Sequence, residues 1–339
     1  MLNGKNILIS SCAGLGDLIM FTPALRRLKE LYPKCKITFM TTEPYVNILA
    51  GLSYIDKVIY IRRKKFFGRS RILKDLFQQD YVIFVDWQPQ ALFFSWLFRI
   101  PHRIGVPKKD HKMNYLFTKL SSYHAIKSTR YVAETNALLF GEALDINLSG
   151  DMTECDVSIP NKFEYKRVKT LLKSAGLNDD DRYVVFAPFT GFHQRDWPVD
   201  YCCALVDKIK EELNMAVILI GPATKYEVAK QIKGINLMGK TTILELIGII
   251  QGAAVSINSD SGPLHIAGAL QIPTVALFSK DLPSRWAPQR KCEILYLNMP
   301  CSPCTNEQAI QCNTLQCIKG ITPVMVFDAL KKQMETYYK

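Results

Sequence analysis

The sequence predicts an α/β protein made of two doubly wound domains in tandem. Short β-branched runs alternate with helical patterns in both halves of the chain, which is typical of parallel sheets with right-handed crossovers. The length of 339 residues is too great for one ordinary core and suits two domains that each bury their own interior. A polar segment, residues 147–160, interrupts the alternation and is the expected linker.

The first domain is expected over residues 1–150. Thr22-Pro23 should open its first long helix, with the hydroxyl as the cap and the proline where its missing N–H does no harm. Strands are predicted at 6–11, 36–41, 57–61 and 81–86, and helices at about 23–31, 71–78 and 131–144.

The second domain is expected over residues 151–322. Its strands are apolar runs of the kind buried on both faces of a sheet, at 183–187, 216–220, 235–238, 254–258 and 274–278. Helices fit at 162–175, 200–213, 224–233, 243–251 and 263–270. A last helix occupies the C-terminal segment 323–339. The pattern does not fix the domain on which this helix packs, and packing back on the N-terminal domain is one arrangement. Ligands are expected in a crevice between the two domains, at the carboxyl ends of the strands.

The composition is that of a globular protein with an anionic partner. Hydrophobic residues make up 48% of the chain and charged residues 22%, which excludes large-scale disorder. No run approaches the roughly 18–20 apolar residues of a membrane-spanning helix, and the N-terminus lacks a signal-peptide pattern, so a cytoplasmic enzyme is expected. The net charge of +12 predicts attraction to nucleic acid, a phospholipid surface or a phosphorylated substrate. No nucleic-acid-binding motif is recognised, so nucleic acid is not an expected partner.

Basic residues gather in two segments of the first half. The first segment favours contact with a membrane or with an acceptor phosphate. It surrounds Phe66 and Phe67 and holds Arg62, Arg63, Lys64, Lys65, Arg69, Arg71 and Lys74. The second segment follows an aromatic run, and a buried helix is the interpretation of that run taken alone. The run contains Phe93, Phe94, Trp96 and Phe98, and the basic residues after it are Arg99, Arg103, Lys108, Lys109 and Lys112.

The motif that most strongly indicates a ligand site lies at residues 258–278. Its pattern predicts a strand, a turn, a helix, a proline and a second strand. Pro263 stands where a helix begins, and the positive end of that helix suits a diphosphate. Asp260 and His265 can add polar contacts. The N–H groups expected to face the anion belong to Ser261, Gly262, Leu264 and His265. A plain strand-to-helix turn with Asp260 as a cap is the alternative, and it leaves the paired Asp and His unexplained.

Two further motifs follow the first strand of each predicted domain. After the first strand, Gly14 and Gly16 let the backbone turn tightly, and Asp17 can act either as a general base or as a helix cap. The third glycine of a dinucleotide-binding fingerprint is missing.

In the second domain, residues 189–198 follow the strand at 183–187. Thr190, Gly191 and Arg195 could hold a phosphate there, and pairing of Arg195 with Asp196 or Asp200 is the alternative.

Four of the ten cysteines are clustered. Two thiols separated by two residues, with two more nearby, suit tetrahedral coordination of zinc or iron, whereas disulfides or free thiols are the alternatives. The four are Cys301, Cys304, Cys312 and Cys317, and the remaining six are scattered as small core or surface residues.

In this order and spacing the motifs resemble glycosyltransferase family 9, the ADP-heptose:lipopolysaccharide heptosyltransferases. The resemblance extends over nearly the whole chain, from Gly-Leu-Gly-Asp-Leu-Ile near the start, through the Trp-Pro element at 197–198, to Asp-Ser-Gly-Pro-Leu-His. It implies a GT-B fold, in which two Rossmann-like domains face a central crevice. It also implies an inverting glycosyltransferase whose ADP-sugar donor is held mainly by the C-terminal domain.

The resemblance also implies roles for particular residues. Asp17 would be the catalytic base, and Thr190 with Arg195, where many relatives carry lysine, would lie at the donor diphosphate beside the 260–265 turn. The loop of Gly239, Lys240, Thr241 and Thr242 would lie near the adenine, and Glu227 near the ribose. Some relatives carry a similar cysteine region with a structural iron. The chemistry itself would require no cofactor, and Mg²⁺ is not indicated.

The expected reaction is a single displacement in which Asp17 deprotonates an acceptor hydroxyl. The acceptor would be an anionic glycolipid of the lipopolysaccharide inner core, contacted by Gly14, Gly16 and the Arg62–Lys65 run, with the enzyme peripheral on the inner face of the cytoplasmic membrane. A sugar-nucleotide epimerase of the same fold is one alternative. A non-catalytic, membrane-associated scaffold is another.

Overall fold

The computed structural model describes residues 2–61, 70–122 and 129–337. The chain forms two compact units, Met1–Ser158 and Ile159–Lys339. The first unit therefore continues past the boundary expected at residue 150. The segment 151–158 is attached to it, because Asp156 forms an ion pair with Arg26 and accepts the hydroxyl of Tyr54 at 2.7 Å.

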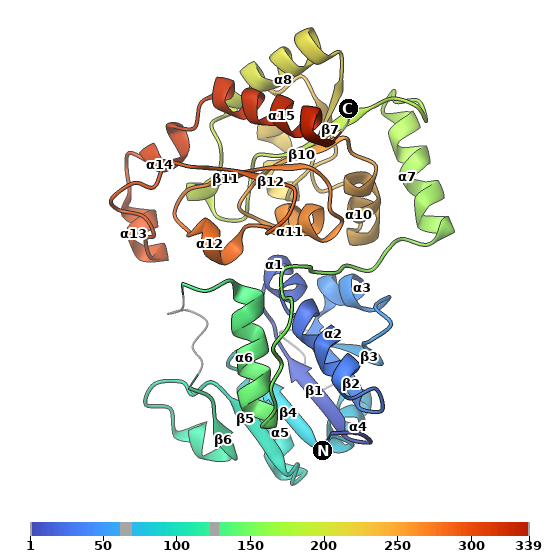
Figure 1. Ribbon diagram of the computed structural model, residues 1–339, viewed down its shortest axis with the longest axis vertical. Coiled ribbons are helices and arrows are strands. Elements are labelled where there is room, and N and C mark those ends of the chain that lie inside the picture. The colour runs from blue at the N-terminus through green and yellow to red at the C-terminus, as the bar shows by residue number, and fades with distance from the viewer. Residues whose placement is uncertain (1, 62–69, 123–128, 338–339) are drawn as a thin grey trace. The chain divides into compact units, whose positions relative to one another are not determined.

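The first unit is one parallel sheet with helices on both faces, in the strand order β3-β2-β1-β4-β5-β6 (Figure 1). Its elements are β1 (Asn6–Ser10), α1 (Leu15–Ile19), α2 (Thr22–Leu31), β2 (Lys36–Thr42), η1 (Glu43–Tyr45), α3 (Val46–Leu49), β3 (Lys57–Ile61), α4 (Ser70–Phe77), β4 (Tyr81–Phe84), α5 (Pro89–Leu97), β5 (His102–Gly105), η3 (Lys112–Leu116), β6 (Lys119–Leu120) and α6 (Val132–Leu144).

Side chains that alternate along the strands fill two cores in this unit. Leu8 and Phe84 point to the face where residues of α4 and α5 pack. The other face holds Phe39, whose ring lies 5.8 Å from that of Phe21, and Phe21 stacks in turn on Phe140 of α6. The sheet is thus covered on both sides, as its continuous apolar strands predict.

One local prediction in this unit is wrong. Helix α2 begins at Thr22 itself, and Phe21, which has no capping side chain, occupies the cap position. The Thr22 hydroxyl instead donates to the main-chain oxygen of Ile19 at 2.6 Å and accepts the N–H of Asp156. The hydroxyl therefore joins the chain at residue 156 to the helix and does not cap the start of the helix.

The second unit is also a parallel sheet of six strands, ordered β12-β11-β10-β7-β8-β9. Its elements are α7 (Lys162–Ser174), β7 (Tyr183–Ala187), η5 (His193–Arg195), α8 (Val199–Leu213), β8 (Ala216–Leu219), η6 (Ala223–Lys225), α9 (Tyr226–Ala229), β9 (Ile235–Asn236), α10 (Ile243–Gln251), β10 (Val255–Ser259), α11 (Gly262–Ala269), β11 (Thr274–Phe278), α12 (Pro283–Trp286), β12 (Cys292–Tyr296), α13 (Asn306–Gln311), α14 (Gln316–Lys319) and α15 (Pro323–Tyr337).

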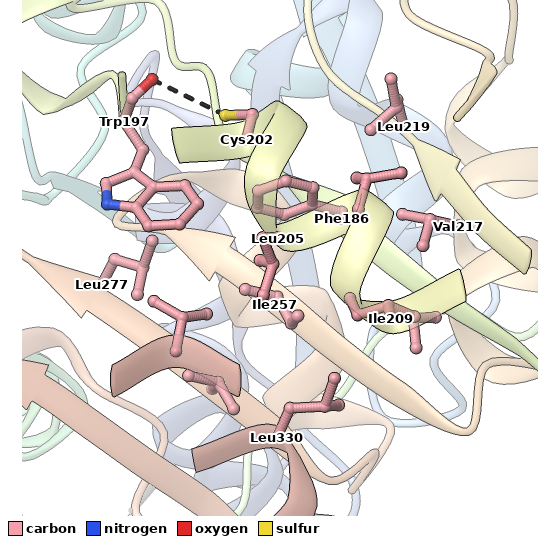
Figure 2. Close-up of a cluster of buried hydrophobic side chains, with 14 of the residues drawn as sticks. Phe186, Trp197, Cys202, Leu205, Ile209, Val217, Leu219, Ile257, Leu277 and Leu330 are labelled. Carbon is pink, nitrogen blue, oxygen red and sulfur yellow. Dashed lines mark hydrogen bonds between the residues drawn. The ribbon is translucent and has the colours of Figure 1, made fainter. Parts of the chain in front are cut away.

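The main core of this unit lies between the sheet and helices α8 and α15 (Figure 2). Trp197 is buried there, and its indole N–H donates to the main-chain oxygen of Ile321 at 2.9 Å. Phe327 and Leu330 place the C-terminal helix against strands β10, β11 and β12 of this unit. The last helix thus packs on the second unit.

Candidate functional site

The three sequence motifs follow the strands at which the order of each sheet reverses. In the second unit, β7 and β10 are neighbours, and the chain leaves them in opposite directions. In the first unit, β1 and β4 stand in the same relation. Ligands of doubly wound sheets bind at the carboxyl ends of such strands. Residues 188–197 and 260–265 follow β7 and β10, and residues 11–17 follow β1.

The turn after β10 leads directly into α11. Ser261 is its cap residue, with extended backbone, and Pro263 lies in the first turn. The N–H of Leu264 donates to the main-chain oxygen of Ser261 at 3.0 Å, so the prediction that it faces an anion is wrong. Within the described part of the chain, the N–H groups of Ser261 and Gly262 have no such acceptor. These two donors lie at the positive end of the helix, where an anion is stabilised.

Four charged side chains form a cluster beside this turn, and we refer to Arg195, Asp260, Lys280 and Asp281 as the Arg195 cluster. Arg195 Nη1 donates to the main-chain oxygen of Asp260 at 3.1 Å and lies 3.5 Å from its carboxylate. Arg195 Nη2 lies 2.6 Å from the carboxylate of Asp281, which also binds Lys280 Nζ at 2.9 Å. The alternative pairing of Arg195 with Asp196 or Asp200 does not form.

The Arg195 cluster is largely out of water. Burial raises the pKa of the Asp260 carboxyl to about 6, and the charge of Arg195 opposes this rise. Arg195 Nε is buried and has no hydrogen-bond partner among the described residues. The ring of Phe192 lies 5.9 Å from both the Arg195 guanidinium and the Lys280 ammonium. The site therefore holds one buried donor that an incoming oxygen could satisfy.

The segment after β7 is held by a second carboxylate, Asp196. It accepts the N–H of Thr190 at 2.7 Å and the ammonium of Lys225 at 2.6 Å, and it contacts His193 Nδ1 at 3.1 Å. The Thr190 hydroxyl donates to the main-chain oxygen of Phe192 and accepts its N–H. A Cβ at Gly191 would meet no atom within 4 Å. The loop is thus internally braced, with open space beside Gly191.

His265 is buried in the first turns of α11. Burial, with a smaller effect of Arg195, lowers the pKa of its imidazole to about 4. Its Nδ1 has no partner in the described chain, and its ring meets Trp286 edge-on at 6.3 Å. The imidazole is therefore neutral at pH 7 and can serve this site as a hydrogen-bonding group, not as a cation.

His265 should make the free energy of unfolding fall as the pH drops from 6.5 to about 4. The unfolded imidazole takes up its proton near pH 6.5 and the folded one near pH 4, so the unfolded state binds more protons in this window. Asp260, with its raised pKa, acts in the opposite sense between about pH 4 and 6. Urea denaturation of the wild type and of His265→Asn, each at pH 7 and pH 5, separates the effect of His265 from that of Asp260. Between pH 7 and pH 5 the free energy of unfolding of the wild type should fall by about 2 kcal/mol more than that of the variant. Equal decreases in the two proteins would contradict the lowered pKa of His265.

Other predicted donor contacts lie after β8 and β9. Glu227 is exposed and pairs with Lys230 at 2.9 Å. Gly239 has φ +68°, and a Cβ there would come within 2.4 Å of Ala223, so glycine is required. Lys240 Nζ lies 4.6 Å from the centroid of the Tyr226 ring.

The next two residues of that loop differ in role. Thr241 is half-buried, and Thr242 caps α10 by exchanging hydrogen bonds with Glu245. Thr242 thus has a structural role in the described chain.

In the first unit, Asp17 stands in the short helix α1 just after β1. Its carboxylate accepts the N–H of Gly14 at 3.2 Å, so the capping role considered for it is present. Gly16 lies in the same helix. The preceding loop is fixed by Asp86, which accepts the N–H of Cys12 at 2.6 Å. The Arg62–Lys65 run lies outside the described residues.

The four clustered cysteines do not form a ligand set in the structure. Among the described residues, no group of three or more His, Cys, Asp or Glu side chains is placed to hold a metal ion. Cys301 is exposed, Cys312 contacts the hydroxyl of Thr314, and all ten cysteines are free thiols. The main chain at Cys304 is anchored elsewhere, donating to the oxygen of Lys280 at 3.0 Å. The structure of the described residues therefore does not confirm the predicted tetrahedral site.

Three charged residues of the site were not predicted from the sequence. Lys225 ends the short helix η6 after β8, and Lys280 and Asp281 follow β11, in segments that match no motif. The signal that could have found them is position alone, because each comes within a few residues of the carboxyl end of a buried strand.

Comparison with known proteins gives a consistent result. The model of glycosyltransferase family 9 (heptosyltransferase) matches residues 69–314. Lipopolysaccharide heptosyltransferase 3 of Escherichia coli (strain K12) is 24% identical over 288 residues, which cover 80% of this chain and 82% of the relative. Lipooligosaccharide heptosyltransferase 2 of Haemophilus ducreyi is 27% identical over 308 residues, covering 84% and 86%.

Two solved structures share the fold. The glycosyl transferase family 9 structure from Veillonella parvula DSM 2008 superimposes with a TM-score of 0.83 at 20% identity, over 99% of both chains. The structure of E. coli ADP-heptose lps heptosyltransferase II does so with a TM-score of 0.76 at 20% identity, over 98% of this chain and 100% of that one. The GT-B fold expected from the sequence is confirmed.

The family match spans most of the chain, and the glycine turns after β1 and β10 lie where doubly wound sheets bind ligands. The chain therefore belongs to glycosyltransferase family 9, the heptosyltransferase family, and is a glycosyltransferase.

Proposed function

We propose that this protein transfers heptose from ADP-heptose to a hydroxyl of a lipopolysaccharide inner-core acceptor, with inversion at the anomeric carbon. The observation that supports this most is the Arg195 cluster beside the N-terminus of α11, since arginine and free N–H groups suit a diphosphate. The relatives named above are lipopolysaccharide or lipooligosaccharide heptosyltransferases, and one solved structure is an ADP-heptose enzyme.

The donor diphosphate would bind at the turn after β10. The N–H groups of Ser261 and Gly262 and the guanidinium of Arg195 would bind its oxygens, and the unpartnered Arg195 Nε supplies one more donor. Thr190, Gly191, Pro263 and Leu264 would shape the pocket, and neutral His265 would offer a hydrogen bond without charge. Lys240, Thr241 and Thr242 are proposed for the adenine side, and Glu227 for the ribose.

In the proposed reaction an acceptor oxygen attacks the anomeric carbon of the donor. Asp17 takes the proton of that hydroxyl as the new C–O bond forms. The bond from the anomeric carbon to the diphosphate breaks on the opposite face, and its electron pair leaves with the ADP. The developing negative charge is stabilised by groups that are already oriented, namely the helix N–H groups and Arg195. No step in this scheme needs a metal.

The acceptor side of the proposal involves the first unit. Gly14 and Gly16 shape the loop beside Asp17, and Arg62, Arg63, Lys64 and Lys65 would bind phosphate groups of an anionic glycolipid. Such an acceptor lies in a membrane, so we propose peripheral association with the inner face of the cytoplasmic membrane. No helix in the described parts of the chain has the length and apolar character needed to cross a bilayer.

A binding and product experiment tests this function. Calorimetry should show that ADP-heptose binds at least about tenfold more tightly than UDP- and GDP-sugars. The reason is that the loop of Lys240, Thr241 and Thr242 is proposed to contact the adenine and so to distinguish it from other bases. Mass spectrometry of a heptose-free core acceptor should show one added heptose. A tight preference for UDP or GDP would contradict heptosyl transfer. Conversion of the sugar nucleotide without an acceptor would indicate the epimerase alternative instead.

The cysteine segment remains a proposed site for a structural zinc or iron, held by Cys301, Cys304, Cys312 and Cys317. Elemental analysis of the purified protein decides this, since a bound structural metal should approach one atom per chain. A content far below that value would remove the proposal.

A further inference from the structure

Helices α4 and α5 carry an apolar surface that the described residues of the first unit leave exposed. The side chains of Phe77, Phe93, Trp96 and Leu97 are 64%, 42%, 42% and 52% exposed. Single exposed apolar residues are common on soluble proteins, but contiguous groups of large ones mark contact surfaces. The expectation that the aromatic run forms a buried helix is therefore only half correct.

The exposed rings belong to one continuous cluster. Phe77 of α4 meets Phe98 edge-on at 5.7 Å, Phe98 lies 6.1 Å from Phe94, and Phe94 lies 5.7 Å from Phe93. The last pair, Phe93 and Trp96, is separated by 5.8 Å. We call Phe77, Phe93, Phe94, Trp96, Leu97 and Phe98 the aromatic face.

The aromatic face is supported from below by the core. Ala91 and Leu92 of α5 are buried against the sheet, so the helix is fixed with its other side outward. No charged residue occurs anywhere in α5, from Pro89 to Leu97. A helix that only covered a sheet would carry polar residues on its outer side.

The charge around the aromatic face indicates which partner covers it. Lys74, one turn before Phe77, and Arg99, directly after Phe98, are both exposed. In the sequence, residues 57–112 hold 13 Lys and Arg against 4 Asp and Glu, and five of the 13 lie in the stretch 62–69, outside the described residues. Aromatic side chains with basic neighbours suit the boundary between lipid headgroups and acyl chains of an anionic membrane.

We propose that the aromatic face inserts into the headgroup boundary of an anionic phospholipid bilayer and holds the first unit there. The proposal deepens the membrane association included in the proposed function by naming the side chains that make the contact. It does not depend on heptosyl transfer, because lipid binding can be measured without donor or acceptor.

Vesicle co-sedimentation tests the proposal with a matched pair of variants. In Phe77→Ser/Phe93→Ser/Trp96→Ser, the partition coefficient onto vesicles of phosphatidylglycerol and phosphatidylethanolamine should fall roughly 30-fold or more, because three apolar side chains are lost from the contact. The control Phe163→Ser/Ile310→Ser removes two side chains of the second unit that are 66% and 61% exposed. It should bind vesicles like the wild type.

Trp96 provides a direct report of insertion. Vesicles with brominated acyl chains should quench part of the tryptophan fluorescence, and Trp96→Phe should remove that quenching while binding persists. All substituted side chains are exposed, so the urea midpoint of each variant should match that of the wild type. Transfer to a short, water-soluble acceptor fragment should also be unchanged, which separates this proposal from the proposed function.

Three results would overturn the proposal. The first is equal vesicle binding by the wild type and the triple variant. The second is equal binding to vesicles of pure phosphatidylcholine, in which case anionic lipid is not the partner. The third is a wild-type dimer in analytical ultracentrifugation that the triple variant loses while neither protein binds vesicles, in which case a second copy of the chain covers the face.

Discussion

Replacing Asp17 with asparagine should lower kcat for sugar transfer about 10³-fold while the Kd for the donor changes by less than about threefold. A positioned general base contributes roughly 10²–10⁴-fold to the rate, and an amide cannot accept the proton of the attacking hydroxyl. Donor binding is assigned to the second unit, so it should be retained. Transfer is measured by the release of ADP, and donor binding by calorimetry with the variant.

The capping contact of Asp17 needs a control, because its carboxylate also accepts the N–H of Gly14. Urea denaturation should show that the free energy of unfolding of Asp17→Asn is lower than that of the wild type by no more than about 1 kcal/mol, which is the usual contribution of a helix-capping residue. Asp80→Asn is the matched variant, since Asp80 pairs with Lys5 just before β4, at the opposite end of the same strands. It should turn over normally. Near-normal turnover by Asp17→Asn would remove Asp17 as the base.

Arg195→Ala should weaken donor binding about 100-fold and reduce kcat/KM by at least as much. The substitution removes a charge-assisted, forked donor from the proposed diphosphate site. It also removes the cation with the larger effect on the buried carboxylate of Asp260, leaving Lys280, so the pKa of Asp260 should rise further above 6. Calorimetry with ADP and with the donor gives the two Kd values.

An arginine elsewhere in the second unit controls for loss of charge. Arg167 of α7, whose side chain is 54% exposed, pairs with the buried Glu245 of α10 at 2.7 Å. Arg167→Ala should leave the donor Kd within about twofold of wild type. Arg195→Lys should fall between wild type and Arg195→Ala, because lysine keeps the charge but not the fork. Wild-type donor affinity in Arg195→Ala would show that the diphosphate binds elsewhere.

The sequence predicted most strands, including the edge strand β3 at its observed bounds, and missed three that lie at or next to a sheet edge. Strands β7 and β11 were predicted at their observed bounds, since a strand buried on both faces is a continuous apolar run. Strands β5, β6 and β12 were missed. His102–Gly105 carries two basic residues and lies beside the two-residue edge strand β6, which breaks its apolar pattern. Cys292–Tyr296 forms the edge of the other sheet and is only half-buried, so its pattern is weak.

The site was predictable in position and less so in its contacts. The glycine turns at Gly14 and Gly262 mark the ends of β1 and β10 in the sequence, and the structure places both at a reversal of strand order. The partners of Arg195 could not be predicted from the sequence. Asp260 and Asp281 follow two different strands, and only the folded sheet brings them together. The exposure of Trp96 was also hidden, because an entirely apolar helix does not reveal which side faces the core.

The pairing of Arg195 with two carboxylates has a consequence for selectivity. A bare arginine in a protein of net charge +12 would attract any polyanion in its surroundings, including free phosphate and nucleic acid. In this protein the guanidinium is already neutralised by Asp260 and Asp281, so an anion gains little from charge alone. An incoming anion must compete with these two carboxylates for Arg195. Only a ligand that also accepts hydrogen bonds from the neighbouring N–H groups should therefore bind.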